Sequence, residues 1–221
     1  MDQQDATRSR PGPKPLRSSS PKTQYLILYN FVSSLLWFIV LGRVVMLVPL
    51  VGFKNVYGGV GEFTKWTQTL ALMEVIHSAV GIVRAPISTT LMQVSSRILL
   101  VWGIVDQFPY LAQSPGYSSM LIAWSITEVI RYSFFVLTLS GFSPAISTWL
   151  RYNTFFVLYP LGISSECWMI YKAIKPASKL REEYAWALYA ILAIYIPGSY
   201  ILYTHMMAQR RKVMRGKRRQ D

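Results

Sequence analysis

Two side chains able to exchange protons, Tyr159 and Glu166, stand inside a long apolar stretch. Ionisable groups at membrane depth cost about 3 kcal/mol on insertion scales, so they indicate a functional role. Seven residues make nearly two helical turns, which predicts both side chains on one helix face, about 10 Å apart along the axis. Pro160 removes a backbone donor and Gly162 leaves room between the pair. The pattern favours a substrate slot. The alternative is a kinked packing helix whose Glu166 pairs with an arginine.

A carboxylate and a phenol together suit general acid–base chemistry. A glutamate held in an apolar bundle can take and return a proton, whereas a tyrosine with an ordinary pKa of about 10 is a good donor and a poor base. We therefore expect Glu166 to carry the main proton transfer, with Tyr159 donating to developing negative charge or to a leaving group. The opposite assignment, with Tyr159 as the base, stays open.

Apolar segments surround this pair along nearly the whole chain. Of the 221 residues 52% are apolar in type and 15% are charged, below the roughly 25% of soluble domains. Spans of roughly 20 residues, enough to cross a bilayer, lie at 25–50, 66–83, 88–105, 118–139, 148–171 and 184–207. They are unbroken and do not alternate, which favours helices over strands. The predicted fold is all-α, a polytopic membrane protein with six transmembrane helices in one bundle.

The net charge of +13 is concentrated at the two ends of the chain. Five of the 23 basic residues precede residue 25, and seven lie at 210–219. Basic ends around an apolar middle indicate cytosolic tails and exclude a nucleic-acid-binding face. We expect a disordered basic cytosolic tail at 1–24, a six-helix catalytic domain at 25–207 and a basic cytosolic tail at 208–221. One loop opposes this orientation, because residues 172–183 carry four basic side chains on the expected lumenal side.

Further ionisable residues lie inside the other spans: Glu74, Arg97, Glu128 and Arg131. Buried charges need partners, so these residues either lock helices together or serve the site, and the sequence leaves both interpretations open. Glu128 and Arg131 are three residues apart on one helix face and are expected to pair. Cys167 is the only cysteine, which excludes an intramolecular disulfide and a multi-cysteine metal site. We expect no metal and no cofactor.

Residues 77–84 have the spacing of a His-Cys-x5-Arg phosphatase loop, but they do not fit that chemistry. The loop needs a thiolate nucleophile, and Ser78 stands in its place at the end of an apolar span rather than after a strand. Phosphatase activity is therefore excluded. Arg84 is expected to be an interfacial positive charge on the cytosolic side.

Three segments together resemble one family. They are residues 150–162 (LRYNTFFVLYPLG) with Glu166, residues 93–97 (QVSSR) and residues 128–134 (EVIRYSF). The chain from residue 25 to the basic tail resembles the very-long-chain (3R)-3-hydroxyacyl-CoA dehydratases, also called protein tyrosine phosphatase-like membrane proteins. The fifth-span motif is long and specific. Several relatives have a non-catalytic cysteine where this chain has Ser78, so that departure leaves the resemblance intact.

The resemblance implies a carbon–oxygen lyase of the endoplasmic reticulum membrane. The implied reaction is the third step of fatty-acid elongation, the loss of water from a long-chain 3-hydroxyacyl-CoA to give the trans-2-enoyl-CoA. The family's catalytic pair falls on Tyr159 and Glu166, and its substrate-binding residues fall on Arg151, Gly162 and Arg97. In the cytosol-in topology Arg84 joins Arg151 at the mouth for the CoA phosphates. The condensing enzyme and the reductases of the elongation cycle are the implied partners.

Two other classes of function compete with the dehydratase interpretation. A transporter or channel would line a path with intramembrane charges, but the chain has no evident internal repeat. A non-catalytic membrane scaffold would recruit partners with its tails, and it would have no use for Tyr159 and Glu166. The preferred acyl-chain length and the oligomeric state cannot be predicted from this sequence.

Overall fold

The computed structural model describes residues 20–218, with side chains as far as Arg211 and at Val213. Most of the two predicted tails therefore lies outside the described residues. Between residues 20 and 218 the chain forms helices and no strand, which confirms the all-α prediction. The α-helices are α1 (Pro21–Val51), α2 (Val56–Thr69), α3 (Leu72–Ala79), α4 (Ile87–Ile98), α5 (Pro115–Leu139), α6 (Ala145–Asn153), α7 (Phe155–Leu180) and α8 (Glu182–Arg218). Shorter elements are η1 (Phe53–Asn55), the π-helical η2 (Leu99–Val105) and η3 (Pro109–Gln113).

Four helical stretches of the described chain are long and apolar enough to cross a membrane: Pro21–Val51, Ile87–Val105, Pro115–Leu139 and Glu182–Arg211. They contain the predicted spans at 25–50, 88–105, 118–139 and 184–207. The first helix begins four residues earlier than expected, because Ser20 caps it by accepting a hydrogen bond from the Thr23 N–H at 3.3 Å. The last helix continues beyond residue 207 to Arg218.

The other two predicted spans are broken helices. The span at 66–83 covers the end of α2 and all of α3, and the two are separated at Leu70 and Ala71 by tight backbone bonds such as Ala71 N–H to the Gln68 carbonyl. The span at 148–171 is interrupted at Thr154, between α6 and α7. There the Thr154 hydroxyl donates to the Leu150 carbonyl at 2.8 Å, a contact that bends helices. Neither predicted span therefore forms one continuous helix.

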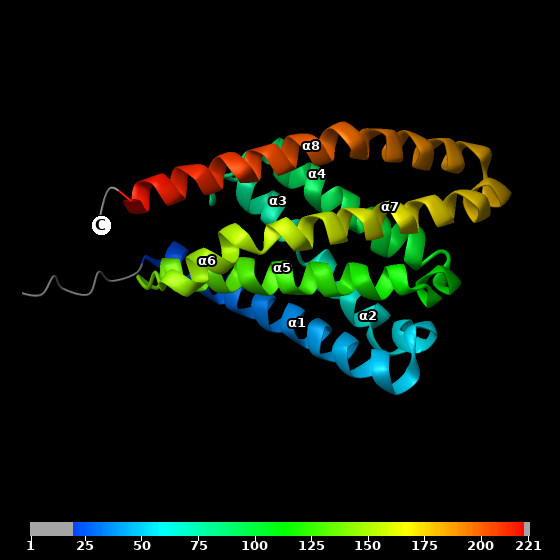
Figure 1. The fold of residues 1–221 in the computed structure, drawn as a ribbon, viewed down its shortest axis with the longest axis horizontal. Coiled ribbons are helices and arrows are strands. Elements are labelled where there is room, and N and C mark those ends of the chain that lie inside the picture. The colour runs from blue at the N-terminus through cyan, green and yellow to red at the C-terminus, as the bar shows by residue number, and fades with distance from the viewer. Residues whose placement is uncertain (1–19, 219–221) are drawn as a thin grey trace, which may run out of the picture.

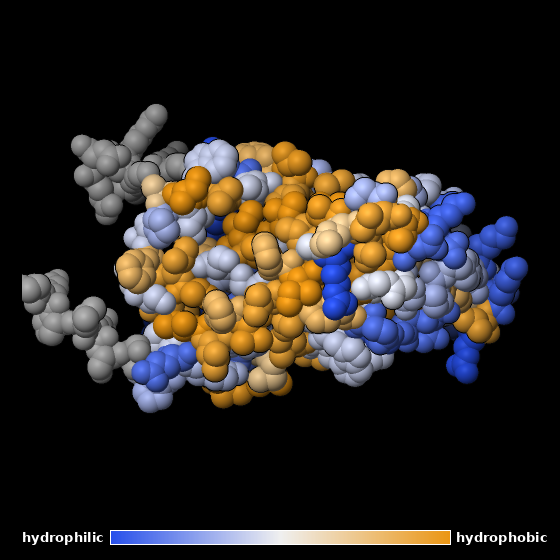
Figure 2. All heavy atoms as spheres, turned by 90° about the horizontal axis from the view of Figure 1, so that it is seen from below, coloured by the Kyte–Doolittle hydropathy of each residue, from blue (hydrophilic) through white to orange (hydrophobic). Residues whose placement is uncertain are grey.

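The helices pack side by side as an elongated bundle (Figure 1). Helix α5 lies against both α1 and α7, and α7 lies against α8. The start of α1, the short α6 and the end of α8 lie at one end of the bundle, which we call the terminal end (Figure 1). The turn between α7 and α8 lies at the opposite end. Figure 2 shows a broad apolar band between more polar ends, as expected of a surface that faces hydrocarbon.

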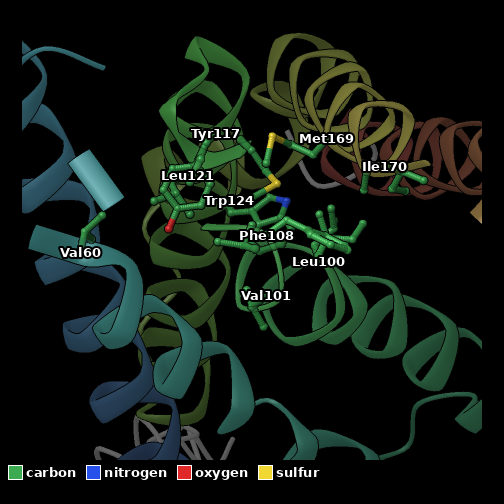
Figure 3. Close-up of a cluster of buried hydrophobic side chains, with 14 of the residues drawn as sticks. Val60, Leu100, Val101, Phe108, Tyr117, Leu121, Trp124, Met169 and Ile170 are labelled. Atoms are coloured by element: carbon green, nitrogen blue, oxygen red, sulfur yellow. The ribbon is translucent and has the colours of Figure 1, made fainter. Parts of the chain in front are cut away.

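The apolar core sits where α5, α7 and η2 meet. Trp124 and Tyr117 of α5 pack there with Leu100 of η2 and with Met169 and Ile170 of α7 (Figure 3). These side chains are at most 2% exposed. The core therefore fixes α7 against α5 at the depth of Met169, three residues after Glu166.

A chain of ion pairs ties α3, α4 and α5 together. Glu128 is 1% exposed and pairs with Arg97 of α4 and with Arg131 of its own helix. Arg131 also forms two bonds of 2.7 Å to Glu74 of α3, which accepts a further bond from the Tyr132 hydroxyl. We call Glu74, Arg97, Glu128 and Arg131 the ion network. Its two positive and two negative charges balance, so each buried charge has a partner. The predicted pairing of Glu128 with Arg131 is confirmed.

More exposed pairs hold the end of α2. The Lys65 ammonium lies 2.7 Å from Asp106 and 2.7 Å from Glu62. The Glu62 side chain is 68% exposed. Such a pair contributes little to stability, because water already solvates the carboxylate.

Replacing Glu128 by alanine should destabilise the protein strongly. The substitution leaves Arg97 and Arg131 buried without their shared carboxylate, which costs about 3–5 kcal/mol for a buried pair broken on one side. Thermal unfolding of the detergent-purified protein measures the loss. Glu62→Ala is the matched control, because Lys65 keeps Asp106, and it should cost less than about 1 kcal/mol. Equal midpoints for the two variants would contradict a stabilising ion network.

Candidate functional site

Helix α7 places Tyr159 and Glu166 near the middle of the bundle. It begins at Phe155, directly after the break at Thr154, and it runs through Pro160 without interruption. Pro160 has no N–H to donate, so the helix loses one internal hydrogen bond beside Tyr159. Both side chains reach helix α8, which lies alongside α7 (Figure 1). The prediction that they share a helix face is consistent with this placement.

Tyr159 lies in a groove between α7 and α8. Its hydroxyl donates to the Ser199 carbonyl at 2.9 Å, and its ring is 5.8 Å from that of Tyr203. The groove holds about 310 Å³ and is open toward the outside of the bundle. It is lined by Tyr159, Pro160, Ile163, Ser199, Tyr200 and Tyr203. The chemistry-bearing phenol thus borders a space that a ligand can enter.

Glu166 lies deeper and is 9% exposed. Its Oε1 accepts a hydrogen bond from the Trp124 indole N–H at 2.8 Å, and its Oε2 accepts one from the Tyr195 hydroxyl at 2.8 Å. Both donors are neutral, and no cation of the described chain forms an ion pair with this carboxylate. The alternative interpretation, in which Glu166 pairs with an arginine, is therefore wrong for the described residues.

Gly162 stands beside the carboxylate. A Cβ added there would meet Glu166 Oε1 at 4.0 Å and the Ala123 Cβ at 3.8 Å, both ordinary contact distances. A methyl group would therefore fit without displacing backbone, and it would occupy the space next to Glu166. The φ of Gly162 is not positive, so the backbone conformation does not require glycine at this position.

The three predicted arginines lie in different surroundings. Arg97 belongs to the ion network and also places its guanidinium 4.9 Å from the centre of the Trp124 ring. Arg151 of α6 lies 4.6 Å from the ring centres of both Phe134 and Phe135, and it forms no ion pair with a described carboxylate. The structure thus brings Arg97, but not Arg151, next to a residue that contacts Glu166. Their roles toward a substrate stay predictions.

Arg84 is exposed in the connection between α3 and α4. At the end of α3 the Ser78 hydroxyl donates to the Ala85 carbonyl of the connection at 2.7 Å, and the His77 Nε2 lies 2.8 Å from the Tyr25 hydroxyl. Ser78 therefore secures the turn and does not face an open anion pocket. This arrangement agrees with excluding a phosphatase loop here.

Sequence reasoning missed the two donors to Glu166. Trp124 and Tyr195 lie in the middle of the predicted spans at 118–139 and 184–207. Aromatic residues with a polar tip usually gather at the membrane interface, so a mid-span Trp or Tyr indicates a buried hydrogen-bond partner. That signal was present in the sequence, but it does not identify the partner.

The described residues contain no cluster of His, Cys, Asp or Glu that could hold a metal ion. What they offer instead is a phenol in a groove and a buried carboxylate on neutral donors. These two groups can donate and accept protons at a bound substrate.

Comparison with known proteins agrees with this arrangement. The family model described as "Protein tyrosine phosphatase-like protein, PTPLA" matches residues 68–216. A "Probable very-long-chain (3R)-3-hydroxyacyl-CoA dehydratase" of Schizosaccharomyces pombe is 46% identical over 199 residues, covering 87% of this chain and 93% of the relative. The "Very-long-chain (3R)-3-hydroxyacyl-CoA dehydratase PASTICCINO 2" of Arabidopsis thaliana is 39% identical over 211 residues, covering 89% and 95%.

A human relative, "Very-long-chain (3R)-3-hydroxyacyl-CoA dehydratase 2", is 34% identical over 206 residues, covering 87% of this chain and 81% of the relative. No solved structure matches the chain. The family model spans more than half of the sequence, and the relatives align over most of their own length. The chain therefore belongs to the protein tyrosine phosphatase-like (PTPLA) family, as its resemblance to the dehydratases predicted.

Proposed function

We propose that this chain removes water from very-long-chain (3R)-3-hydroxyacyl-CoA to give the trans-2-enoyl-CoA, the third step of the fatty-acid elongation cycle. Relatives from fungi, plants and mammals that align with most of this chain bear the name of this dehydratase. The single structural observation behind the proposal is the buried Glu166 carboxylate, which no cation neutralises among the described residues. It lies on the same helix as Tyr159, which lines the groove.

The reaction requires two proton movements. The C2–H bond breaks and its electron pair forms the C2–C3 double bond, while the C3–O bond breaks and the hydroxyl leaves as water after gaining a proton. Neither proton moves readily at neutral pH without positioned groups, each worth about 10²–10⁴-fold. In the proposal Glu166 takes the C2 proton and Tyr159 donates, either to the thioester oxygen as enolate charge develops or to the departing hydroxyl.

The groove between α7 and α8 suits a chain-like substrate. Its wall is largely aromatic, from Tyr159, Tyr200 and Tyr203. Gly162 leaves the space beside Glu166 unfilled, so the thioester carbons can approach the carboxylate. Tyr159 gives up its bond to the Ser199 carbonyl when a substrate oxygen replaces that acceptor. The acyl chain then continues among apolar side chains.

The CoA phosphates are proposed to stay at the terminal end of the bundle. Arg151 precedes Tyr159 by eight residues and belongs to α6, which lies at the terminal end (Figure 1). The connection that carries Arg84 lies toward the same end (Figure 1). Guanidinium groups bind phosphate oxygens strongly, and Arg151 has no competing carboxylate among the described residues. Arg97, further inside, is proposed to support the site through Trp124 rather than to reach the phosphates.

We further propose six membrane crossings, with α2–α3 and α6–α7 as the two broken spans. Both ends of the described chain lie at the terminal end of the bundle, as an even number of crossings requires (Figure 1). The basic tails favour a cytosolic location for that end, and we propose that the membrane is that of the endoplasmic reticulum. The reductase that makes the 3-hydroxy substrate, the reductase that consumes the enoyl product and the condensing enzyme are the proposed neighbours there.

A transporter or channel is not favoured. Its intramembrane charges would line a path, whereas Glu74, Arg97, Glu128 and Arg131 are engaged with one another in the ion network.

Removing either proposed catalytic group should abolish most of the activity. Glu166→Gln keeps the size of the side chain but removes the base, and Tyr159→Phe removes the donor, so each should lower kcat by about 10²-fold or more. Purified protein incubated with a 3-hydroxyacyl-CoA, with the enoyl product followed over time, measures this loss. Tyr171→Phe, an exposed position on α7, is the matched control and should retain full activity. Wild-type turnover by Glu166→Gln would refute the role of Glu166 as the base, and a wild-type enzyme that forms no enoyl product would refute the proposed function.

Arg151 should affect substrate binding more than the chemical step. Arg151→Ala removes the cation at the mouth, and we expect KM to rise about tenfold with a small change in kcat, as for loss of uniform binding. Arg151→Lys keeps the charge, so its KM should lie between those of the wild type and Arg151→Ala. Arg43→Ala, which removes a cation that contacts the Gly59 carbonyl instead, serves as the control. Wild-type kinetics in both Arg151 variants would contradict a role at the mouth.

The proposed topology can be tested with single cysteines in a Cys167→Ser background. In sealed microsomes a membrane-impermeant maleimide should label Lys22→Cys and Ser88→Cys, which lie at the starts of α1 and α4. Lys54→Cys and Lys179→Cys, in η1 and near the end of α7, should react only after permeabilisation. Equal labelling of the variants at positions 54 and 88 would exclude a crossing by α2–α3.

A further inference from the structure

The two oxygens of Glu166 are bound by donors of different chemical kinds. Oε1 receives the indole N–H of Trp124 from α5, and Oε2 receives the hydroxyl of Tyr195 from α8, each at 2.8 Å. Three helices thus meet at one carboxylate, since Glu166 itself belongs to α7. Neither donor carries charge, so the contacts orient the carboxylate without supplying a counter-ion.

The two donors differ in what they permit. An indole N–H can only donate, so Oε1 must present a lone pair to Trp124 whether or not Glu166 carries a proton. A tyrosine hydroxyl can donate or accept, so it can rotate and accept from Oε2 when that oxygen is protonated. The geometry therefore leaves Oε2 as the oxygen that can hold a proton while both hydrogen bonds persist.

Trp124 is itself held in place. Its side chain is 2% exposed, and the Arg97 guanidinium covers its ring at 4.9 Å. Arg97 is fixed in turn by its ion pair with Glu128. On α8, Tyr195 lies one helical turn before Ser199, whose carbonyl accepts a hydrogen bond from Tyr159. Neighbouring turns of α8 therefore contact both proposed catalytic side chains.

We propose that Trp124 and Tyr195 are positioning residues that hold the Glu166 carboxylate and direct its proton to Oε2. This inference rests on the proposed role of Glu166 as the proton-transfer group. In the reaction Oε2 takes the C2 proton of the substrate, Tyr195 changes from donor to acceptor, and Trp124 keeps Oε1 from rotating into the same place. The cycle closes when Oε2 passes that proton to the departing hydroxyl, which leaves as water, or returns it to Tyr159 where Tyr159 has protonated the hydroxyl, and Tyr195 donates again.

Kinetics of Tyr195→Phe and Trp124→Phe test the proposal. Each removes one hydrogen-bond donor to a carboxylate and should lower kcat by about tenfold or more, with KM changed less than about twofold. A purely structural role would lower the amount of folded enzyme rather than separate kcat from KM. Tyr189→Phe and Trp186→Phe, both exposed on α8, are the matched controls and should behave as wild type.

A double-mutant cycle tests whether the donors act through Glu166. Glu166→Asp keeps a carboxylate but shortens its reach by one methylene, so its oxygens no longer meet both donors as they do now. Adding Tyr195→Phe to Glu166→Asp should then cost less than about twofold, against the tenfold or larger cost in the wild type. Full additivity would show that Tyr195 acts independently of the carboxylate and would overturn the proposal.

The outcomes separate this inference from the proposed function. Wild-type kcat in both Tyr195→Phe and Trp124→Phe, with Glu166→Gln inactive, would overturn the positioning role and leave the dehydratase function standing. An active Glu166→Gln would overturn the positioning role together with the role of Glu166 as the base, whereas a wild-type enzyme that forms no enoyl product would overturn the dehydratase function. Tyr195→Phe deletes one oxygen atom only, so its result decides the matter if Trp124→Phe, which leaves space in the core, fails to yield folded protein.

Discussion

Glu128 is the most completely enclosed charge of the bundle, and it is bound between two arginines on different helices. In an apolar interior a carboxylate without such partners would cost several kcal/mol, so α4 and α5 must keep the register that brings Arg97 and Arg131 to it. Arg131 extends the same requirement to α3 through Glu74. The position of Trp124 follows, because Arg97 covers its ring. The geometry of the candidate site therefore depends on the ion network, which lies outside the site.

The contrast between the two buried carboxylates explains how one bundle separates structure from chemistry. Glu128 is surrounded by cations, so its negative charge is compensated and it has little freedom to change protonation. Glu166 contacts only neutral donors, so its charge is oriented but not cancelled. Neutral hydrogen-bond donors supply direction while leaving the carboxylate available as a base. The same residue type thus serves two purposes through its neighbours alone.

The local sequence pattern predicted the fold more completely than it predicted the candidate site. Long apolar runs predicted α1, α5 and α8 because a helix that crosses hydrocarbon needs little besides length and composition. The breaks near Leu70 and at Thr154 depend on individual backbone and hydroxyl contacts, which hydropathy does not encode. Tyr159 and Glu166 were found because they share one motif. The donors to Glu166 were not, because α5 and α8 meet α7 only through tertiary packing.

The groove that contains Tyr159 opens on the outside of the bundle, beside exposed apolar residues such as Val157, Tyr200 and Ile201. In a membrane, lipid tails therefore border the open side of the groove. Each methylene moved from hydrocarbon into water costs about 0.8 kcal/mol, so a long acyl chain gains nothing by leaving through the aqueous end. For the proposed substrate, the acyl chain lies among the apolar side chains that border the groove and continues into the lipid tails without passing through water. The bilayer, as much as the enzyme, then limits the length of the acyl chain.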